Sequence, residues 1–186
     1  MKRMIPAVVA VVLLSSGAFV AAGQQNAAPE TNPVSNAVRK SLERESKILT
    51  AAAEAMPADK YGFRPTPEQM TFAHLVMHMA GSNNFLCSKI SGTEAPKTEK
   101  LSEADGKEKL AAALKASFDY CTQALAKVDD ANLGDQLPFF GGRTVSRAGA
   151  MIALTNDFYD HYSMAAMYLR LNGVLPPTAQ GKKEKE

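Results

Sequence analysis

The chain of 186 residues has only two cysteines and three histidines. It contains no Gly-rich phosphate loop, no internal repeat and no basic patch with interleaved aromatic residues, which argues against nucleotide-binding and repeat architectures and against nucleic-acid binding. No stretch alternates between apolar and polar residues for long enough to predict a strand, so a sheet-based fold is not expected. No second long apolar run follows the N-terminal one, and no membrane segment is expected beyond it.

Residues 1–22 have the pattern of a signal peptide. Lys2 and Arg3 precede an apolar run, and the small residues around Ala22 suit cleavage. No cysteine stands there to accept a lipid, so we expect an exported protein, periplasmic or secreted, with an uncleaved anchor as the alternative. Without this segment 19 basic residues remain beside 19 acidic ones. The mature chain is therefore nearly neutral, which gives no support to nucleic-acid binding.

The remaining length of about 164 residues suits one domain. Residues 23–34 are polar and contain two prolines, which predicts a disordered leader. We expect the folded domain at residues 35–177 and a charged flexible tail at residues 178–186.

Four segments have the spacing of amphipathic helices. They are residues 35–55, 66–91 and 102–128, and a stretch from Ser146 that ends at the stop signal of Gly173, Pro176 and Pro177. The connection at residues 93–100 is short. The fold class predicted is therefore all-α, an antiparallel up-and-down four-helix bundle. The longer segment 129–144 contains Phe139 and Phe140, which either cover one end of the bundle or simply pack.

The last helix carries an apolar stripe with two polar residues inside it. Asp157 and His161 are four residues apart and project from the same face. The stripe itself consists of residues at steps of three and four: Met151, Leu154, Phe158, Ala165, Tyr168 and Leu169. An oxygen and an imidazole nitrogen that point together into a bundle interior are suited to hold a metal.

The other two histidines, His74 and His78, lie one turn apart on the second helix. Two imidazoles and a carboxylate make a three-ligand set with open coordination positions, as a catalytic metal site requires. The spacing alone also fits a plainer arrangement, in which one histidine faces solvent and a core histidine bonds Asp157 or a tyrosine.

The segments KYGFRPTPEQMTFAHLVMHMAGSNNFLCSKISG and DFYDHYSMAAMYLRLNGVLPP resemble the DinB superfamily of four-helix bundles, in particular its exported members. The likeness covers residues 35–177. Family members carry a ligand histidine within a Leu-x-x-His-hydrophobic-Ala pattern, matched here around His78, and an H-x-x-x-H pair followed by a glycine, matched by His161 and Gly173. Asp157 stands where the other histidine of the pair is usual. His74 matches no usual ligand position.

The resemblance implies a divalent ion, zinc, nickel, manganese or iron, held by His78, Asp157 and His161. Related enzymes are hydrolases or thiol transferases acting on small molecules. The carboxylate at Asp157 favours a harder or more weakly held metal, and equally fits a degenerate site in a non-catalytic binding bundle. His74 is a candidate auxiliary base. Asp160, Tyr159 and Tyr162 flank the ligands, where ordinary packing or surface roles are equally open.

Cys87 and Cys121 fall late in the second helix and in the third. In an oxidising compartment two cysteines in neighbouring antiparallel helices predict a disulfide, although two buried thiols fit the sequence as well. Bundles of this size often dimerise, so a homodimer is also expected.

Overall fold

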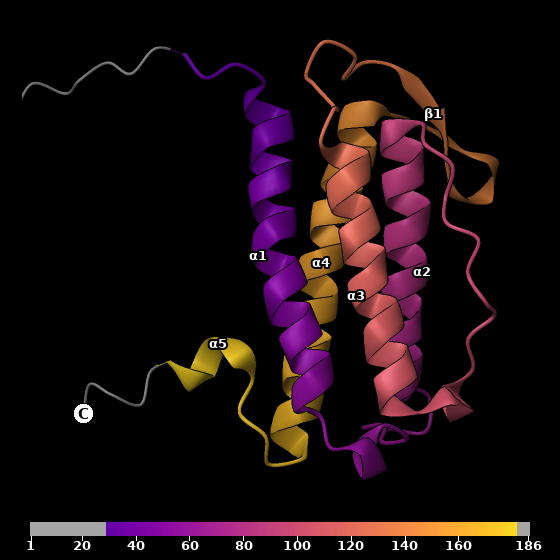
Figure 1. The fold of residues 1–186 in the computed structure, drawn as a ribbon, viewed down its shortest axis with the longest axis vertical. Helices are drawn as coiled ribbons and strands as arrows, with labels where there is room; N and C mark the ends of the chain where they lie inside the picture. Colours follow the sequence, from indigo (N-terminus) through magenta and orange to yellow (C-terminus); the bar gives the residue numbers. More distant parts are fainter. Residues whose placement is uncertain (1–28, 182–186) are drawn as a thin grey trace, which may run out of the picture. The chain divides into compact units, whose positions relative to one another are not determined.

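A computed structural model describes residues 29–181. The predicted signal peptide lies outside these residues, as do residues 23–28 of the leader and residues 182–186 of the tail. The four long helices predicted from periodicity are confirmed (Figure 1): α1 (Pro33–Ala55), α2 (Phe72–Ser91), α3 (Gly106–Leu125) and α4 (Arg147–Leu171).

The start of α2 differs from the prediction. The helix begins at Phe72 rather than near Thr66, after the 3-10 helix η1 (Ala58–Lys60) and a series of turns. Thr71 precedes it as the N-cap, because its side chain accepts a hydrogen bond from the backbone N–H of His74 at 3.0 Å. The cap therefore fixes the start of the helix that carries both His74 and His78.

Helices α2 and α3 run side by side in the same direction. Asn83 Nδ2 donates to Ser117 Oγ at 2.9 Å, and Cys87 forms a disulfide with Cys121. Both pairs are separated by 34 residues, and an equal separation at two levels requires parallel helices. The disulfide thus joins two parallel helices and not the antiparallel pair that was expected.

Helix α1 runs opposite to α3. Arg39 near its start donates to the carbonyl of Leu125 at 3.0 Å, and Lys107 at the start of α3 donates to the carbonyl of Glu54 at 2.6 Å. Figure 1 shows α1 and α4 running one way and α2 and α3 the other. The expected antiparallel up-and-down order is therefore wrong: the order is down, up, up, down.

The parallel pair is made possible by residues 92–105, which return along the length of the bundle (Figure 1). Gly92 ends α2 in the left-handed region, with φ 73°. A helix of 20 residues is about 30 Å long, and the 14 residues between α2 and α3 reach about 46 Å when extended. The chain then forms the 3-10 helix η2 (Glu103–Asp105), so α3 begins four residues later than predicted. We call residues 93–101 the crossover strap.

A small hairpin precedes α4. Strand β1 (Gln136–Pro138) pairs antiparallel with β2 (Thr144–Ser146) around the 3-10 turn η3 (Phe140–Gly142). The expectation of an all-α chain without strands is wrong to this extent, because strands of three residues are too short to show a period of two. The fold is mostly helical.

Both hairpin aromatics pack against the side of α2. The Phe140 ring stacks on Phe85 with centroids 4.1 Å apart, and Phe139 lies 6.0 Å from the same ring. Of the two roles considered for these residues, packing against α2 is the one observed, although Phe140 keeps 45% of its surface exposed.

The core lies between the four helices. All six apolar residues of the predicted α4 stripe are buried: Met151, Leu154, Phe158, Ala165, Tyr168 and Leu169. Tyr168 also donates its hydroxyl to the carbonyl of Met70 at 2.9 Å, which ties the end of α4 to the segment before α2. After α4 the short helix α5 (Pro177–Gln180) docks through Thr178 on Tyr162 at 2.8 Å, so this part of the predicted tail is ordered. Within residues 29–181, no helix is both long and apolar enough to cross a bilayer.

Candidate metal centre

Antiparallel neighbours α2 and α4 bring the three predicted ligand residues together. His78 comes from α2, while Asp157 and His161 come from successive turns of α4. One ligand atom from each residue lies within 4.8 Å of the other two, and the rings of His78 and His161 have centroids 5.0 Å apart. Residues 79 positions apart in the chain thus meet, as the resemblance implied.

Burial changes steeply across this trio. His161 is buried, with 5% of its surface exposed, whereas the Asp157 side chain is 22% exposed and His78 faces solvent. The site is therefore anchored in the core at His161 and accessible at His78. Access of this kind is what a catalytic metal site needs and a closed structural site lacks.

Hydrogen bonds orient the buried imidazole. His161 Nδ1 lies 2.6 Å from the backbone carbonyl of Asp157 and 3.3 Å from its carboxylate Oδ2. Two acceptors at Nδ1 assign the proton of the neutral ring to that nitrogen and leave Nε2 with a free lone pair. An acceptor behind a ligand imidazole is the usual means by which proteins fix such a ring. Asp157 is thus positioned both beside the ligand atoms and behind His161.

The same contacts separate the acidities of the two histidines. Burial lowers the pKa of His161, but the hydrogen bond and negative charge of Asp157 outweigh it, so the pKa is raised overall. The pKa of His78 is lowered, first by partial burial against α4 and then by the charge of His161. His78 is therefore the more readily available of the two as a neutral ligand.

The donor set fits a divalent ion. Metal–nitrogen and metal–oxygen bonds of about 2.0–2.2 Å place ligand atoms roughly 3.3–4.2 Å apart. The largest separation within the trio is 4.8 Å at most, so a small rotation of the exposed His78 side chain suffices. Two nitrogens and one oxygen suit the zinc, nickel, manganese or iron expected from the sequence.

His74 lies outside the trio. Its Nδ1 is 3.1 Å from Oε1 of Glu103, and Oε2 of the same carboxylate accepts a hydrogen bond from Thr71 at 2.5 Å. These two hydrogen bonds lower the pKa of Glu103. In the sequence Glu103 is an ordinary acidic residue at the predicted start of a helix, and no spacing pattern connects it with His74. It reaches His74 because the parallel arrangement places the N-termini of α2 and α3 at the same end.

The two tyrosines that flank the ligands have partners of their own. Tyr159 shares a hydrogen bond of 3.0 Å with Ser41, and Tyr162 donates to Thr178 at 2.8 Å. Asp160 is exposed, and its charge contributes to the raised pKa of His161. The two tyrosines therefore tie α4 to α1 and α5.

Comparison with known proteins gives a consistent family. Residues 41–163, which include the whole trio, match the DinB superfamily. Similar folds occur in a DinB-like protein of Bacillus subtilis (TM-score 0.61, 19% identity, covering 74% of this chain and 92% of that one) and one of Bacillus cereus (0.63, 14%, 76% and 95%). The mycothiol-dependent maleylpyruvate isomerase is also similar (0.56, 14%, 68% and 58%). No curated protein sequence matches the chain.

Proposed function

The chain belongs to the DinB superfamily, and from this membership and the trio of α2 and α4 we propose that it is a metal-dependent hydrolase acting on a small molecule. The observation that carries the proposal is the cluster itself: ligand atoms of His78, Asp157 and His161 within 4.8 Å, with solvent access on the His78 side. Three protein ligands leave coordination positions for water and substrate.

A divalent ion bound there would act as a Lewis acid. It would lower the pKa of a water bound to it, so that hydroxide is available near neutral pH. The protein's part is to fix the ligands. His161 is held by the Asp157 carbonyl and offers Nε2, while Asp157 supplies a negative charge to balance the cation. His78 closes the set from the solvent side.

His74 and Glu103 support a general base beside this site. With Nδ1–H directed to Glu103, the Nε2 of His74 is an acceptor, and half of the side chain is exposed to solvent. His74 precedes His78 by one helical turn, which separates neighbouring Cβ atoms by about 5–6 Å. A histidine oriented by a carboxylate is a recurring arrangement for proton transfer.

A second candidate is thiol transfer. The similarity of fold to the mycothiol-dependent maleylpyruvate isomerase favours it, because the same ligand set can activate a low-molecular-weight thiol. An exported location weighs against it, since such thiols are cytoplasmic. Export is itself part of the proposal, supported by the pattern of residues 1–22 and by the Cys87–Cys121 disulfide.

The test compares two histidines of the same helix. The mature protein, purified without tag or chelator, would be loaded with zinc, nickel, manganese or iron(II) and assayed on nitrophenyl esters and phosphoesters. We expect His78→Ala to lose both metal and turnover. His74→Ala should keep its metal and lose about 100-fold in kcat, the usual effect of removing a general base.

Two results would contradict the proposal. Hydrolysis that is unchanged in metal-free protein would remove the metal from the mechanism. A fully loaded parent without hydrolysis, but with transfer of a low-molecular-weight thiol to an electrophile, would replace the hydrolase with the second candidate.

A further inference from the structure

Helix α4 carries large apolar side chains on its outer face as well as on the face that packs in the core. Within residues 29–181, seven large apolar side chains are exposed, and four of them belong to this helix: Ile152, Tyr159, Met167 and Leu171. Val34 at the start of α1 is another, and it shares a groove with Tyr159. A helix with apolar residues on all sides is typically covered on all sides.

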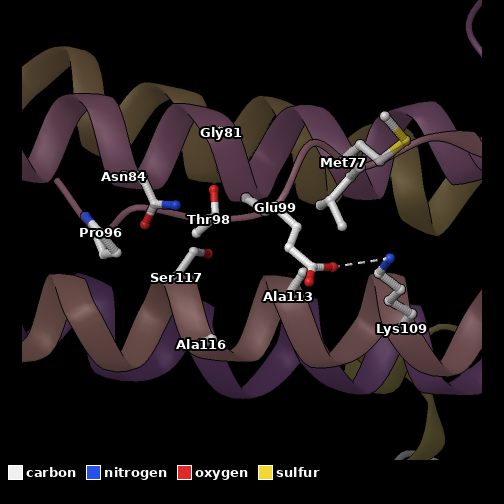
Figure 2. Close-up of a pocket in the computed structure, with 12 residues that line it drawn as sticks. Met77, Gly81, Asn84, Pro96, Thr98, Glu99, Lys109, Ala113, Ala116 and Ser117 are labelled. Atoms are coloured by element: carbon white, nitrogen blue, oxygen red, sulfur yellow. Dashed lines mark ion pairs between the residues drawn. The ribbon is translucent and has the colours of Figure 1, made fainter. Parts of the chain in front are cut away.

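The outer faces of α1 and α3 are different. After its first turn, α1 exposes only alanine and charged residues, and the exposed residues of α3 are small, polar or charged. Lys109 of α3 is paired with Glu99 of the crossover strap at 3.4 Å (Figure 2). The exposed apolar surface is therefore specific to α4, and such a surface is typical of a contact with another protein.

Only two of the eight exposed residues of α4 are charged, and their signs are opposite. Asp160 and Arg170 lie five residues before and five residues after the buried Ala165. Neither side chain forms an ion pair with another residue of the described part of the chain, and the Arg170 guanidinium makes no hydrogen bond there either. Both charges are therefore available to a partner.

The positions of these charges select the orientation of a second copy. In a parallel pair related by a two-fold axis each residue faces its own copy, so like charges would meet at Asp160 and at Arg170. In an antiparallel pair that crosses at Ala165, residues equally distant from Ala165 lie opposite each other, and two Asp160–Arg170 pairs form between the copies. The same crossing sets Ser163 opposite Met167, a small residue opposite a large one that can pack into the space beside it.

We propose that the outer face of α4 binds a second copy of this chain, with the two α4 helices antiparallel and crossing at Ala165. The homodimer expected from the sequence thereby gains a defined face. The contact extends along about 30 Å of helix and about 10 Å of width, which is small for a specific interface, so the dimer is reversible with a Kd in the micromolar range. It does not depend on the proposed hydrolase, because no metal ligand is among the exposed residues of α4.

The test is sedimentation velocity of the mature chain with its disulfide intact. The parent should change from monomer to dimer between about 1 and 500 µM. Asp160→Arg and Arg170→Asp should each raise the Kd about tenfold or more, because each sets like charges opposite each other. The double variant Asp160→Arg/Arg170→Asp restores opposite charges and should return the Kd to within about threefold of the parent value. Glu108→Arg, the same change of charge at an exposed position of α3, should leave the Kd unchanged.

The crossing point has a test of its own. Both native cysteines are in the disulfide, so Ser163→Cys and Met167→Cys each add a single free thiol. A mixture of these two variants should form a covalent dimer under mild oxidation faster than either variant alone, because positions 163 and 167 face each other only in the antiparallel crossing.

A parent chain that stays monomeric at about 500 µM would overturn the proposal. A parent dimer that neither charge reversal weakens would overturn it as well, because its contact would lie elsewhere. Faster cross-linking of one cysteine variant alone than of the mixture would contradict the antiparallel order.

Discussion

Removal of the Cys87–Cys121 disulfide is expected to lower the free energy of unfolding by about 4 kcal/mol. The bond closes a loop of 34 residues. The loop-entropy relation gives about 13 cal/mol/K for a loop of this length, or about 3.8 kcal/mol at 25 °C. The loop also contains the whole crossover strap, so the bond restrains the segment that sets the parallel order of α2 and α3.

The assay is urea unfolding followed by circular dichroism, on the oxidised protein, the reduced protein and the Cys87→Ala/Cys121→Ala double variant. With an m value of about 2 kcal/mol/M, the midpoint should fall by about 2 M on reduction. The midpoint of the double variant should be lower still, because both cysteine side chains are fully buried and their replacement by alanine leaves a cavity. A reduced protein less than about 1 kcal/mol below the oxidised one would refute the loop-entropy reasoning.

Three further outcomes are expected. Asp157→Asn should weaken metal binding by about 10–100-fold in a chelator competition, and an unchanged affinity would show that this carboxylate neither ligates nor orients His161. In metal-free protein, NMR titration should find a higher pKa for His161 than for His78, and Asp157→Asn should bring the two closer; the reverse order would contradict the contacts of His161. Glu45 is fully buried, and its carboxylate has no hydrogen-bond partner within residues 29–181; burial raises its pKa despite the charge of Arg44, whose Nε lies 3.1 Å from Oε1. The parent should therefore lose stability as pH rises from about 4.3 through the folded pKa, so Glu45→Gln should gain about 1 kcal/mol at pH 7 and almost nothing at pH 4; a loss at pH 7 would contradict this.

The helices and the trio were accessible from the sequence because both depend on local spacing. Apolar steps of three and four predict which face of α4 is buried, and residues 157 and 161 share that face whatever the rest of the chain does. The match around His78 then supplied the partner from a second helix. These features do not depend on the order of the helices.

The order of the helices was not accessible, because it depends on how far a connection reaches. The segment after Gly92 looked like a short loop, yet an extended chain of that length spans the bundle. Everything that follows from the parallel pair was missed with it: the contact of Glu103 with His74, and the cavity of about 490 Å³ that the crossover strap lines together with α2 and α3 (Figure 2). In an antiparallel pair, Glu103 would lie at the opposite end of α2 from His74.

The most direct test of the metal site is elemental analysis of the mature protein, purified without tag or chelator, beside His78→Ala, Asp157→Ala and His161→Ala. The account predicts about one divalent ion per chain in the parent and a large loss in all three folded variants. A folded parent that carries no metal and takes up no added zinc, nickel, manganese or iron(II) would contradict the central claim.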